Sequence, residues 1–540
     1  MIQAKDGEWT MNKHLKRPAW LSGIWAFAAA LLIWAAAAPD GVRAEPEIDS
    51  CTSLLVGRLA SADGSTMTSH SCDSSTDRTW ITMVPRAKHK PGATAKVYLE
   101  AKRTKGPDDK DRLETGEIPQ VPETFAYLNA AYPIMNERQL AIGETTIGGR
   151  AELQSDEGLI DAPELYRLVL ERAATAREAI RVADDLTSRF GYTDWGECFT
   201  FADPKEVWHF EIFGPGKGRK GAVWTAQRVP DDEIGVSANA SRIRAVNLAD
   251  PERFMASANV VSLAEELGFW TQAAGRPFEF CYAYAPKSRT SLSCRRREWR
   301  ALSLLAPSLG LDPESENYPF SVKPEKKVAV GDLLRIFRDT YADTAYDMTR
   351  TLTTVNKKGE AVKSLVANPF LNGDWRELLH VKRERTICSP AATYLQITQS
   401  RDWFPDPIGG VVWIGYDNPA TTPHTPFYIG IARMPASYMV DGRWGFRRDC
   451  AWWAFRTVSK LALLRWQAMT KDIEKVWSGI ENGAFTEQAK VEVEALALYK
   501  ADPAKARAYL TRTSLDLAEK AVAAYWALAD ELLGKYAAEF

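Results

Sequence analysis

The sequence has almost no net charge, so composition gives no electrostatic reason to expect a nucleic-acid partner. Lysine plus arginine number 68 and aspartate plus glutamate number 70, which leaves a formal net charge of -2. A protein that binds phosphate backbones or an anionic membrane surface concentrates positive charge, and this chain shows no such excess. We therefore predict no nucleic-acid partner.

Motifs for a metal or an organic cofactor are also missing. The cysteines form no Cys-x-x-Cys pair, and the histidines lack the short spacings typical of zinc sites. We predict that the protein uses no metal and no cofactor. Seven cysteines remain after the N-terminal segment, at positions 51, 72, 198, 281, 294, 388 and 450. Their number is odd, so full disulfide pairing, which export would permit, leaves one thiol for another task.

Long hydrophobic runs are absent except for one near the N-terminus. Residues 20–38 are mostly apolar, Lys13 and Arg17 lie in a basic patch before them, and small residues end the segment at Ala44. This layout is typical of a secretory signal peptide, here residues 1–44. The run could also cross a bilayer, so an uncleaved anchor stays open. We expect an exported protein, periplasmic or secreted, that is not stably inserted in a membrane after cleavage.

The rest of the chain shows no internal repeat and no disordered linker, so we expect one integrated unit. Strand-like segments follow Cys51, and an Asp-Gly pair at 63–64 between two of them is a strong hairpin signal. If these strands pair, residues near Cys51 face residues near 73–76. Residues 162–191 have apolar positions at helical spacing and predict two helices that end at Gly191. Sheets covered by helices are the expected arrangement.

The last part of the chain is nearly all helical from about Trp452 onward. Asp502 and Pro503 are typical N-cap and first-turn residues, so they predict the start of a long closing helix. Strands and helices both occur before this region.

Five separate blocks, together with the closing helices, carry a resemblance to a known family. The blocks are CTSLLVGRLASADGSTMTSHSCDS, MNERQLAIGETTIGGR, GYTDWGECFTFADPKEVWHFEIFG, VSANASRIR and DWFPDPIGGVVWIGYDNPATTPHTPFYIG. In sequence and in order they resemble the C69 (formerly U34) dipeptidases. These are cysteine-type N-terminal-nucleophile (Ntn) hydrolases, related to secernins and more distantly to penicillin V and bile-salt acylases. The resemblance covers essentially residues 51–540.

The resemblance implies an α+β fold with four layers, αββα, in which two antiparallel sheets lie between helices, and a helical C-terminal extension. It implies that the nucleophile is the first residue of the mature chain, here Cys51. Exposing it requires removal of the signal peptide and then of a propeptide, residues 45–50, by self-cleavage before Cys51. An Ntn-hydrolase catalytic domain would span residues 51–450, with residues 451–540 as a helical region packed on its core.

An N-terminal cysteine carries its own base, which gives this arrangement a chemical reason. A thiol attacks only as the thiolate, and a free cysteine has a pKa of about 8.5. The terminal α-amine has a pKa of about 7.7–8.0, so part of it is unprotonated at neutral pH and can take the thiol proton. A chain that keeps the propeptide has no free amine at Cys51. Processing is therefore activation.

The resemblance also implies supporting residues. Asp73 corresponds to an aspartate near the nucleophile, which we expect to hydrogen-bond the thiol or the amine. Asn239 matches an asparagine that orients the substrate or the cysteine amine, and Arg297 matches an arginine later in the family pattern. Thr146 falls near an oxyanion-hole asparagine of the acylases and can supply a hydroxyl or a backbone N–H.

Three further residues have less definite roles. Glu144 and Glu197 lie in family-like blocks, and either can hold the free α-amino group of a dipeptide. His70 stands where the acylases carry an arginine. Strand alternation places His70 and Asp73 on opposite faces unless a bulge intervenes, so the role of His70 stays open.

We therefore predict a dipeptidase that acts through an N-terminal cysteine and a thioester acyl-enzyme. The alternatives are an amidohydrolase of the same superfamily that acts on N-acyl amino acids or acyl amides, and a non-catalytic secernin-like binding protein. Cys51 as half of a disulfide is a further interpretation. A lipid anchor fits poorly because Asp49 stands where a small or apolar residue is needed. The expected partner is a dipeptide or short peptide, and a homo-oligomer stays open.

Overall fold

The computed structural model of the protein describes residues 50–104, 106 and 112–539. They belong to one compact unit, Asp49–Phe540. The predicted signal peptide and residues 45–49 of the predicted propeptide lie outside the described residues. Ser50, the last residue of that propeptide, is described and lies directly before Cys51.

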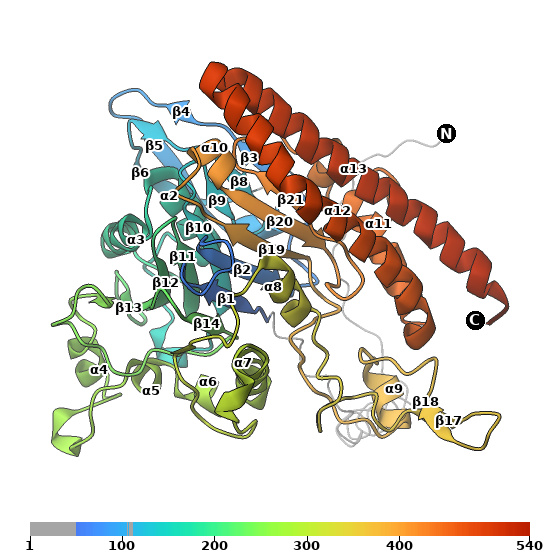
Figure 1. The fold of residues 1–540 in the computed structure, drawn as a ribbon. Helices are drawn as coiled ribbons and strands as arrows, with labels where there is room; N and C mark the ends of the chain where they lie inside the picture. The colour runs from blue at the N-terminus through green and yellow to red at the C-terminus, as the bar shows by residue number, and fades with distance from the viewer. Residues whose placement is uncertain (1–49, 105, 107–111, 540) are drawn as a thin grey trace, which may run out of the picture. The chain divides into compact units, whose positions relative to one another are not determined.

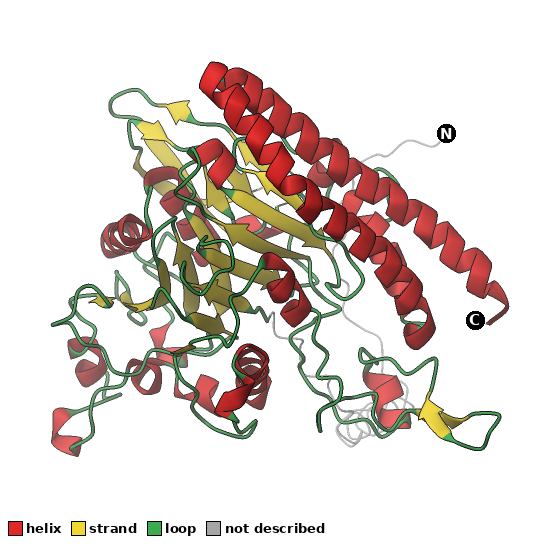
Figure 2. Ribbon diagram, viewed as in Figure 1, coloured by secondary structure: helices red, strands yellow, loops and turns green. Residues whose placement is uncertain are grey.

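Two large antiparallel sheets form the centre of the fold (Figures 1 and 2). The seven-stranded sheet has the order β16 (Ser321–Val322), β14 (Ile234–Ser237), β1 (Ser53–Val56), β2 (Met67–Cys72), β19 (Tyr394–Gln399), β20 (Val411–Tyr416), β21 (Thr425–Tyr428). The eight-stranded sheet has the order β15 (Phe254–Ala256), β13 (Val223–Val229), β12 (Val207–Phe213), β11 (Glu197–Ala202), β10 (Ala141–Thr146), β9 (Met135–Asn136), β8 (Tyr127–Asn129), β3 (Thr82–Val84).

The remaining strands form three two-stranded ribbons, and twelve α-helices occur in the described residues. The ribbons pair β4 (Ala87–Lys88) with β7 (Glu123–Thr124), β5 (Thr94–Leu99) with β6 (Leu113–Pro119), and β17 (Thr353–Val355) with β18 (Ala361–Lys363). The helices are α2 (Ala162–Arg172), α3 (Ala176–Phe190), α4 (Ser262–Glu266), α5 (Phe280–Tyr284), α6 (Pro286–Thr290), α7 (Leu292–Leu305), α8 (Val330–Phe337), α9 (Gly373–Leu378), α10 (Asp406–Gly409), α11 (Ala451–Ala462), α12 (Trp466–Ala501) and α13 (Pro503–Tyr536).

The two large sheets pack against each other closely. The hydroxyls of Thr68 in β2 and Thr200 in β11 lie 2.6 Å apart and join the sheets. Gly143 in β10 allows the approach, because a Cβ there would lie 2.2 Å from the carbonyl oxygen of Ser69 in β2. A side chain at position 143 would push the two sheets apart in the region that holds the predicted site residues.

Helices contact both sheets on their other faces (Figure 1). Helix α2 packs on the eight-stranded sheet, where the Tyr166 hydroxyl donates to the carbonyl oxygen of Gly143 at 2.7 Å. Helices α11, α12 and α13 contact the β20 and β21 edge of the seven-stranded sheet. The prediction of an α+β fold with large antiparallel sheets and a helical C-terminal region is confirmed.

Local signals read from the sequence are also confirmed. The two helices predicted over residues 162–191 are α2 and α3, and α3 ends at Gly191 with a left-handed φ of 78°, which favours glycine. The Asp502 carboxylate caps α13 by accepting from the backbone N–H of Ala504 at 2.9 Å, with Pro503 in the first turn. Within the described part of the chain, we find no helix both long and apolar enough to span a bilayer.

The predicted hairpin forms, and its register determines what lies beside Cys51. β1 and β2 are antiparallel, with Leu55 opposite Thr68. Continued towards the open end, this register places Ser53 opposite His70 and Cys51 opposite Cys72. The backbone N–H of Ser50 donates to the carbonyl oxygen of Asp73 at 3.3 Å. The predicted approach of the Cys51 region to the Asp73 region is therefore confirmed.

Candidate active site

Asn239 holds the backbone nitrogen of Cys51. The Cys51 N–H donates to Asn239 Oδ1 at 2.9 Å, and Asn239 Nδ2 donates to the carbonyl oxygen of Thr146 at 2.8 Å. Asn239 follows β14, the neighbour of β1, and has a left-handed φ of 60°. Asparagine tolerates that conformation better than most residues. The turn after β14 thus aims one amide side chain at the backbone nitrogen of Cys51.

Arg297 holds the other backbone group of Cys51, its carbonyl oxygen. It is 1% exposed, and each of its five N–H groups donates to an acceptor of this chain. The acceptors are Ser293 O at 2.9 Å, Cys51 O at 2.6 Å, Thr52 Oγ1 at 3.0 Å, Ala238 O at 3.1 Å and Asn239 Oδ1 at 2.9 Å. With all donors engaged, Arg297 acts here as a positioning group that ties Cys51 to the turn after β14.

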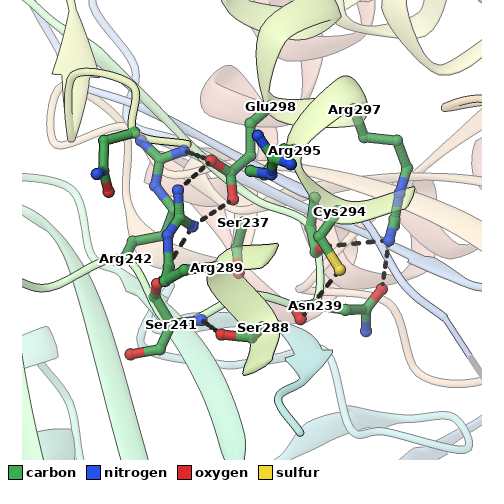
Figure 3. A network of polar contacts seen from close by, with 12 residues as sticks. Ser237, Asn239, Ser241, Arg242, Ser288, Arg289, Cys294, Arg295, Arg297 and Glu298 are labelled. Carbon is green, nitrogen blue, oxygen red and sulfur yellow. Dashed lines mark hydrogen bonds and ion pairs between the residues drawn. The ribbon is translucent and has the colours of Figure 1, made fainter. Parts of the chain in front are cut away.

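Helix α7 delivers Arg297, and a second set of contacts keeps that helix in register (Figure 3). Cys294 Sγ, one turn before Arg297, donates to Asn239 O at 3.4 Å. The buried carboxylate of Glu298 accepts from Arg289 at 3.0 Å and forms an ion pair with Arg242 at 2.5 Å. Figure 3 shows Arg297 and Cys294 reaching Asn239 while Glu298 reaches the two arginines. The network therefore fixes α7 against the turn that carries Asn239.

His70 and Glu144 form an ion pair beside the Cys51 thiol. His70 Nε2 lies 2.8 Å from Glu144 Oε2, and both side chains are fully buried. Three potential metal-ligand atoms, one each from Cys51, His70 and Glu144, all lie within 4.8 Å of one another. The other ring nitrogen, His70 Nδ1, has no hydrogen-bond partner among the described residues. The imidazole therefore lies beside the thiol with one ring nitrogen not engaged by the described residues.

This cluster of Cys51, His70 and Glu144 is also a possible set of metal ligands. A thiolate, an imidazole and a carboxylate are ligands that zinc accepts. The three residues are far apart in the sequence, so ligand spacing alone could not reveal the set. The reaction proposed below needs no metal there.

Glu144 and Glu197 share one hydrogen-bonded environment with unequal charges. Burial alone would raise the pKa of Glu144, but the hydrogen bond with Glu197 and the charge of His70 lower it to about 2. Burial and the neighbouring Glu144 charge raise the pKa of Glu197 well above its usual value. Thr146 Oγ1 donates to Glu144 Oε1 at 3.0 Å. This coupling favours the anion on Glu144 and the proton on Glu197.

Asp73 lies near Ser50, the residue before Cys51. It forms an ion pair with Arg385, which is far along the chain. Asp73 Oδ2 forms an ion pair with Arg385 and accepts from Ser71 Oγ at 3.3 Å. Asp73 Oδ1 is buried and has no hydrogen-bond partner among the described residues. Burial raises the pKa of Asp73, although Arg385 and Arg297 act in the opposite direction.

The Cys51 thiol itself is held in its neutral form. Cys51 is 3% exposed, and burial followed by the charge of Glu144 raises its pKa well above the usual value. A backbone hydrogen bond at Asp73 acts in the opposite direction. All seven cysteines lie in the described residues and none is in a disulfide. A thiol in this environment becomes a nucleophile only when a base takes its proton.

The structure brings the six other predicted site residues into the neighbourhood of Cys51. The roles given to them stay predictions. Glu144 already contacts Thr146 and His70 in this state, so the assignment of a substrate amine to it would require an exchange of partners. The residues gathered around Cys51 are Asp73, Glu144, Thr146, Glu197, Asn239 and Arg297.

Sequence reasoning left the role of His70 open and missed Arg385. His70 lies opposite Ser53 in the β1–β2 hairpin and faces the eight-stranded sheet. The sequence of the hairpin loop did not determine this register. Arg385 lies in a loop among other cations, 335 positions from its partner Ser50, and no sequence pattern marks it.

Comparisons with known proteins agree with the geometry. The profile of peptidase family C69 matches residues 50–479. A probable dipeptidase of Latilactobacillus sakei is 26% identical over 397 residues, which cover 71% of this chain and 74% of that protein. A probable dipeptidase of Salmonella dublin is 26% identical over 443 residues, covering 77% and 90%. Probable dipeptidase B of Streptococcus pyogenes serotype M1 is 22% identical over 481 residues, covering 87% and 90%.

Proposed function

The chain belongs to peptidase family C69, and on that premise we propose that it is a cysteine-type dipeptidase whose nucleophile is the freed N-terminal Cys51. One observation carries the proposal: Asn239 and Arg297 converge on the backbone nitrogen and oxygen of Cys51. Buried backbone groups normally pair with other backbone groups in secondary structure, whereas here two side chains take that place. The names of the similar proteins, probable dipeptidases, support the substrate class.

The fold proposed for this activity is the four-layer Ntn-hydrolase sandwich. Two facing antiparallel sheets, with helices packed on the outer face of each, support it. In this arrangement Cys51 lies just before β1, in the space between the two sheets. The helical region from residue 451 onward packs on the outer face of the seven-stranded sheet.

The proposed mechanism begins with cleavage of the Ser50-Cys51 peptide bond. In the uncleaved chain the Cys51 nitrogen is an amide and cannot act as a base. His70, paired with Glu144, is the titratable side chain beside the thiol in that state. After cleavage the nitrogen is an amine, and the contact with Asn239 Oδ1 keeps it oriented next to its own thiol. Burial raises the pKa of the thiol, so this base is essential for forming the thiolate.

Peptide hydrolysis then follows in two stages. The Cys51 thiolate bonds to the substrate carbonyl carbon, the carbon–nitrogen bond breaks, and the leaving amine takes the proton first removed from the thiol. Water hydrolyses the thioester, releases the acyl residue as a carboxylic acid and restores the thiol. Asn239 Nδ2 donates one hydrogen to the carbonyl oxygen of Thr146 and carries a second N–H, and we assign the developing oxyanion to that second donor.

Recognition of a dipeptide requires a group for its free amine. Asp73 Oδ1 is a buried carboxylate oxygen near Cys51 that lacks a hydrogen-bond partner within the described residues, as Glu197 Oε1 also does. We propose that it accepts a hydrogen bond from the mature Cys51 amine or from the amine of the substrate. A carboxylate there favours a protonated amine electrostatically. We further propose that the protein is exported, from the signal-peptide pattern of residues 1–44.

The test combines intact mass with a substrate panel. The purified wild-type chain should begin at Cys51 and hydrolyse unmodified dipeptides, whereas N-acyl amino acids should be poor substrates. Cys51→Ala should keep the propeptide and be inactive, and Cys51→Ser should process yet turn over slowly. Preference for N-acyl substrates would instead favour the amidohydrolase. A stable wild-type chain that keeps its propeptide and hydrolyses neither class would favour a binding protein.

A further inference from the structure

We propose that Arg385 is a catalytic residue of maturation, which holds the carbonyl oxygen of the bond that is cut before Cys51. This inference rests on the proposed function, since it concerns the cleavage that frees the nucleophile. Neither the sequence pattern nor the family resemblance singled out Arg385.

Arg385 contacts the acyl side of that bond directly. Its Nη2 donates to the carbonyl oxygen of Ser50 at 3.2 Å, and its Nε donates to Ser50 Oγ at 2.8 Å. The guanidinium therefore donates hydrogen bonds to both the main chain and the hydroxyl of Ser50. Contact with the carbonyl oxygen is the important one, because negative charge develops on that atom when a nucleophile adds to the carbon.

Other contacts keep the guanidinium in this position. Asp73 forms an ion pair with Arg385 Nη2, the carbonyl oxygen of Thr386 accepts from Nη1, and the side chain is only 13% exposed. The Tyr341 hydroxyl donates to the carbonyl oxygen of Arg385 at 2.9 Å and so holds its backbone. A charge fixed in place before the reaction need not reorganise when the oxyanion forms, which is how preorganised donors lower a barrier.

The two sides of the Ser50-Cys51 bond are therefore held separately. Arg385 holds the Ser50 carbonyl, whereas Asn239 holds the Cys51 nitrogen at 2.9 Å and Arg297 holds the Cys51 carbonyl at 2.6 Å. The backbone N–H of Ser50 also donates to Asp73 O. A peptide bond fixed at both ends beside a thiol is oriented for intramolecular attack.

The reaction that this geometry serves balances without any co-reactant except water. Cys51 Sγ, after losing its proton, bonds to the Ser50 carbonyl carbon, and the carbonyl oxygen becomes the oxyanion that faces Arg385. The oxyanion collapses, the carbon–nitrogen bond breaks, and the Cys51 nitrogen takes a proton to become the amine. Water then displaces Sγ from the thioester, which yields the Ser50 carboxylate and the Cys51 thiol.

Removal of one preorganised oxyanion donor costs roughly 10²–10³ in rate in a well-studied protease. We expect Arg385→Gln to slow cleavage before Cys51 by at least about 10²-fold, because glutamine keeps a donor but loses the charge. Arg385→Lys should be intermediate, since it keeps the charge but not the fork of donors. The measurement is the conversion of freshly refolded precursor to the mature chain, followed by intact mass.

Two matched controls separate this role from others. Arg383→Gln changes an exposed arginine two positions away and should mature at the wild-type rate. Ser50→Ala removes the hydroxyl contact with Arg385 but keeps the carbonyl contact, so it should slow maturation far less than Arg385→Gln. Thermal melting of each precursor shows whether it is folded. Millimolar guanidinium should restore cleavage to Arg385→Ala and not to Cys51→Ala, which identifies a missing charge in a folded protein.

The outcomes distinguish this inference from the function on which it rests. Slow maturation of Arg385→Gln with fast maturation of Arg383→Gln and Ser50→Ala supports it. Wild-type-like cleavage of Arg385→Gln overturns the role of Arg385 and leaves the dipeptidase proposal intact. Equal slowing by Ser50→Ala and Arg385→Gln also overturns it, because anchoring of the hydroxyl would then account for the effect. A wild-type chain that never cleaves before Cys51 overturns both proposals.

Discussion

Two buried clusters of a cysteine, a histidine and a glutamate can be compared within the described part of the chain, and they differ in what surrounds the cysteine. In the first, Cys51, His70 and Glu144 lie between the two large sheets. The Cys51 backbone is held at its nitrogen by Asn239 and at its oxygen by Arg297. The peptide carbonyl before Cys51, that of Ser50, accepts a hydrogen bond from the charged side chain of Arg385.

The second cluster is built from Cys198 in β11 and from His209 and Glu211 in β12. His209 Nε2 lies 3.3 Å from Cys198 Sγ and 2.8 Å from Glu211 Oε1. A catalytic triad places the nucleophile on one ring nitrogen and the orienting carboxylate on the other. Here Nε2 lies near both groups and Nδ1 lies 3.6 Å from Cys198 Sγ, so the geometry alone does not separate this cluster from a triad. What separates it is the surroundings of Glu211 and of the cysteine backbone.

Glu211 in the second cluster has a structural task instead. It accepts from the backbone N–H of Arg242 at 2.5 Å, from Ile243 at 3.2 Å and from the Ser241 hydroxyl. These residues follow Asn239 in the turn after β14. The second cluster therefore anchors the segment that carries a site residue of the first. The two clusters share the same three residue types. They differ in the side-chain contacts to the Cys51 backbone and to the carbonyl before it, and on this difference we base the proposal for Cys51.

The largest contrast is expected between the two cysteines. Cys51→Ala should block maturation and lower dipeptide turnover by roughly 10⁴–10⁶-fold, the scale seen when a protease loses its nucleophile. Cys198→Ala should mature and turn over dipeptides, and should lower the free energy of unfolding by about 1 kcal/mol. Intact mass and initial rates on the same dipeptide measure both. Loss of activity in Cys198→Ala, with a normal melting temperature, would break the comparison.

The histidines should differ next. His70→Gln should slow maturation by at least about 10²-fold, the lower range for a general acid–base, because the precursor has no free amine to serve instead. It should affect the mature enzyme less, since the Cys51 amine is then present. His209→Gln should leave the maturation rate close to that of the wild type. Maturation half-times and kcat of each mature chain provide the readouts, and equal effects of the two substitutions would contradict the assignment.

The hold on the nucleophile's nitrogen should have a measurable cost of its own. Asn239→Ala removes the acceptor for the Cys51 nitrogen and should lower kcat by about 10²-fold, as misplacement of a reacting group by about 1 Å does. Ser241→Ala, in the same turn but directed at Glu211, should lower kcat much less. The separate measurement of kcat and KM decides this, since a general loosening of the turn would lower kcat equally in both variants.

The smallest expected effect is on stability and comes from the shared proton of Glu197. Burial and the Glu144 charge raise the pKa of Glu197, so the folded chain keeps a proton that the unfolded chain loses near pH 4.3. The free energy of unfolding should therefore fall as pH rises from about 4.3 towards the folded pKa, by up to about 1.4 kcal/mol per pH unit. Urea denaturation from about pH 5 to 8 measures this slope.

Glu197→Gln should make that slope shallower by up to about 1.4 kcal/mol per pH unit, because glutamine does not titrate and can still donate to Glu144. Other buried carboxyls with a raised pKa, such as Asp73, keep the remainder of the slope. Glu494→Gln, at an exposed position of α12, is the matched control and should keep the wild-type slope. An unchanged slope in Glu197→Gln would place the proton elsewhere.

Local signals and the family resemblance predicted different parts of this structure. The Asp-Gly pair predicted the β1–β2 hairpin, and the helical spacing predicted α2 and α3. Asn239 and Arg297, separated from Cys51 by 188 and 246 positions, came only from the resemblance, because no local pattern reports contacts at that distance.

The residues that escaped prediction did so for physical reasons. The face of His70 depends on the strand register, and a slip of one residue would have turned it away from Cys51. Arg385 lies in a loop with Lys382 and Arg383, and only tertiary structure selects it as the partner of Ser50 and Asp73. Contacts between distant segments, rather than composition, determine which of these cations matters.

The central claim is that the chain becomes an enzyme when the bond before Cys51 is cut. The most direct measurement is the intact mass of the purified wild-type protein, taken together with its rate on an unmodified dipeptide as maturation proceeds. We predict that the active species begins at Cys51 and that activity rises in proportion to its fraction. A protein that begins before Cys51, stays that way and hydrolyses dipeptides at full rate would contradict the account.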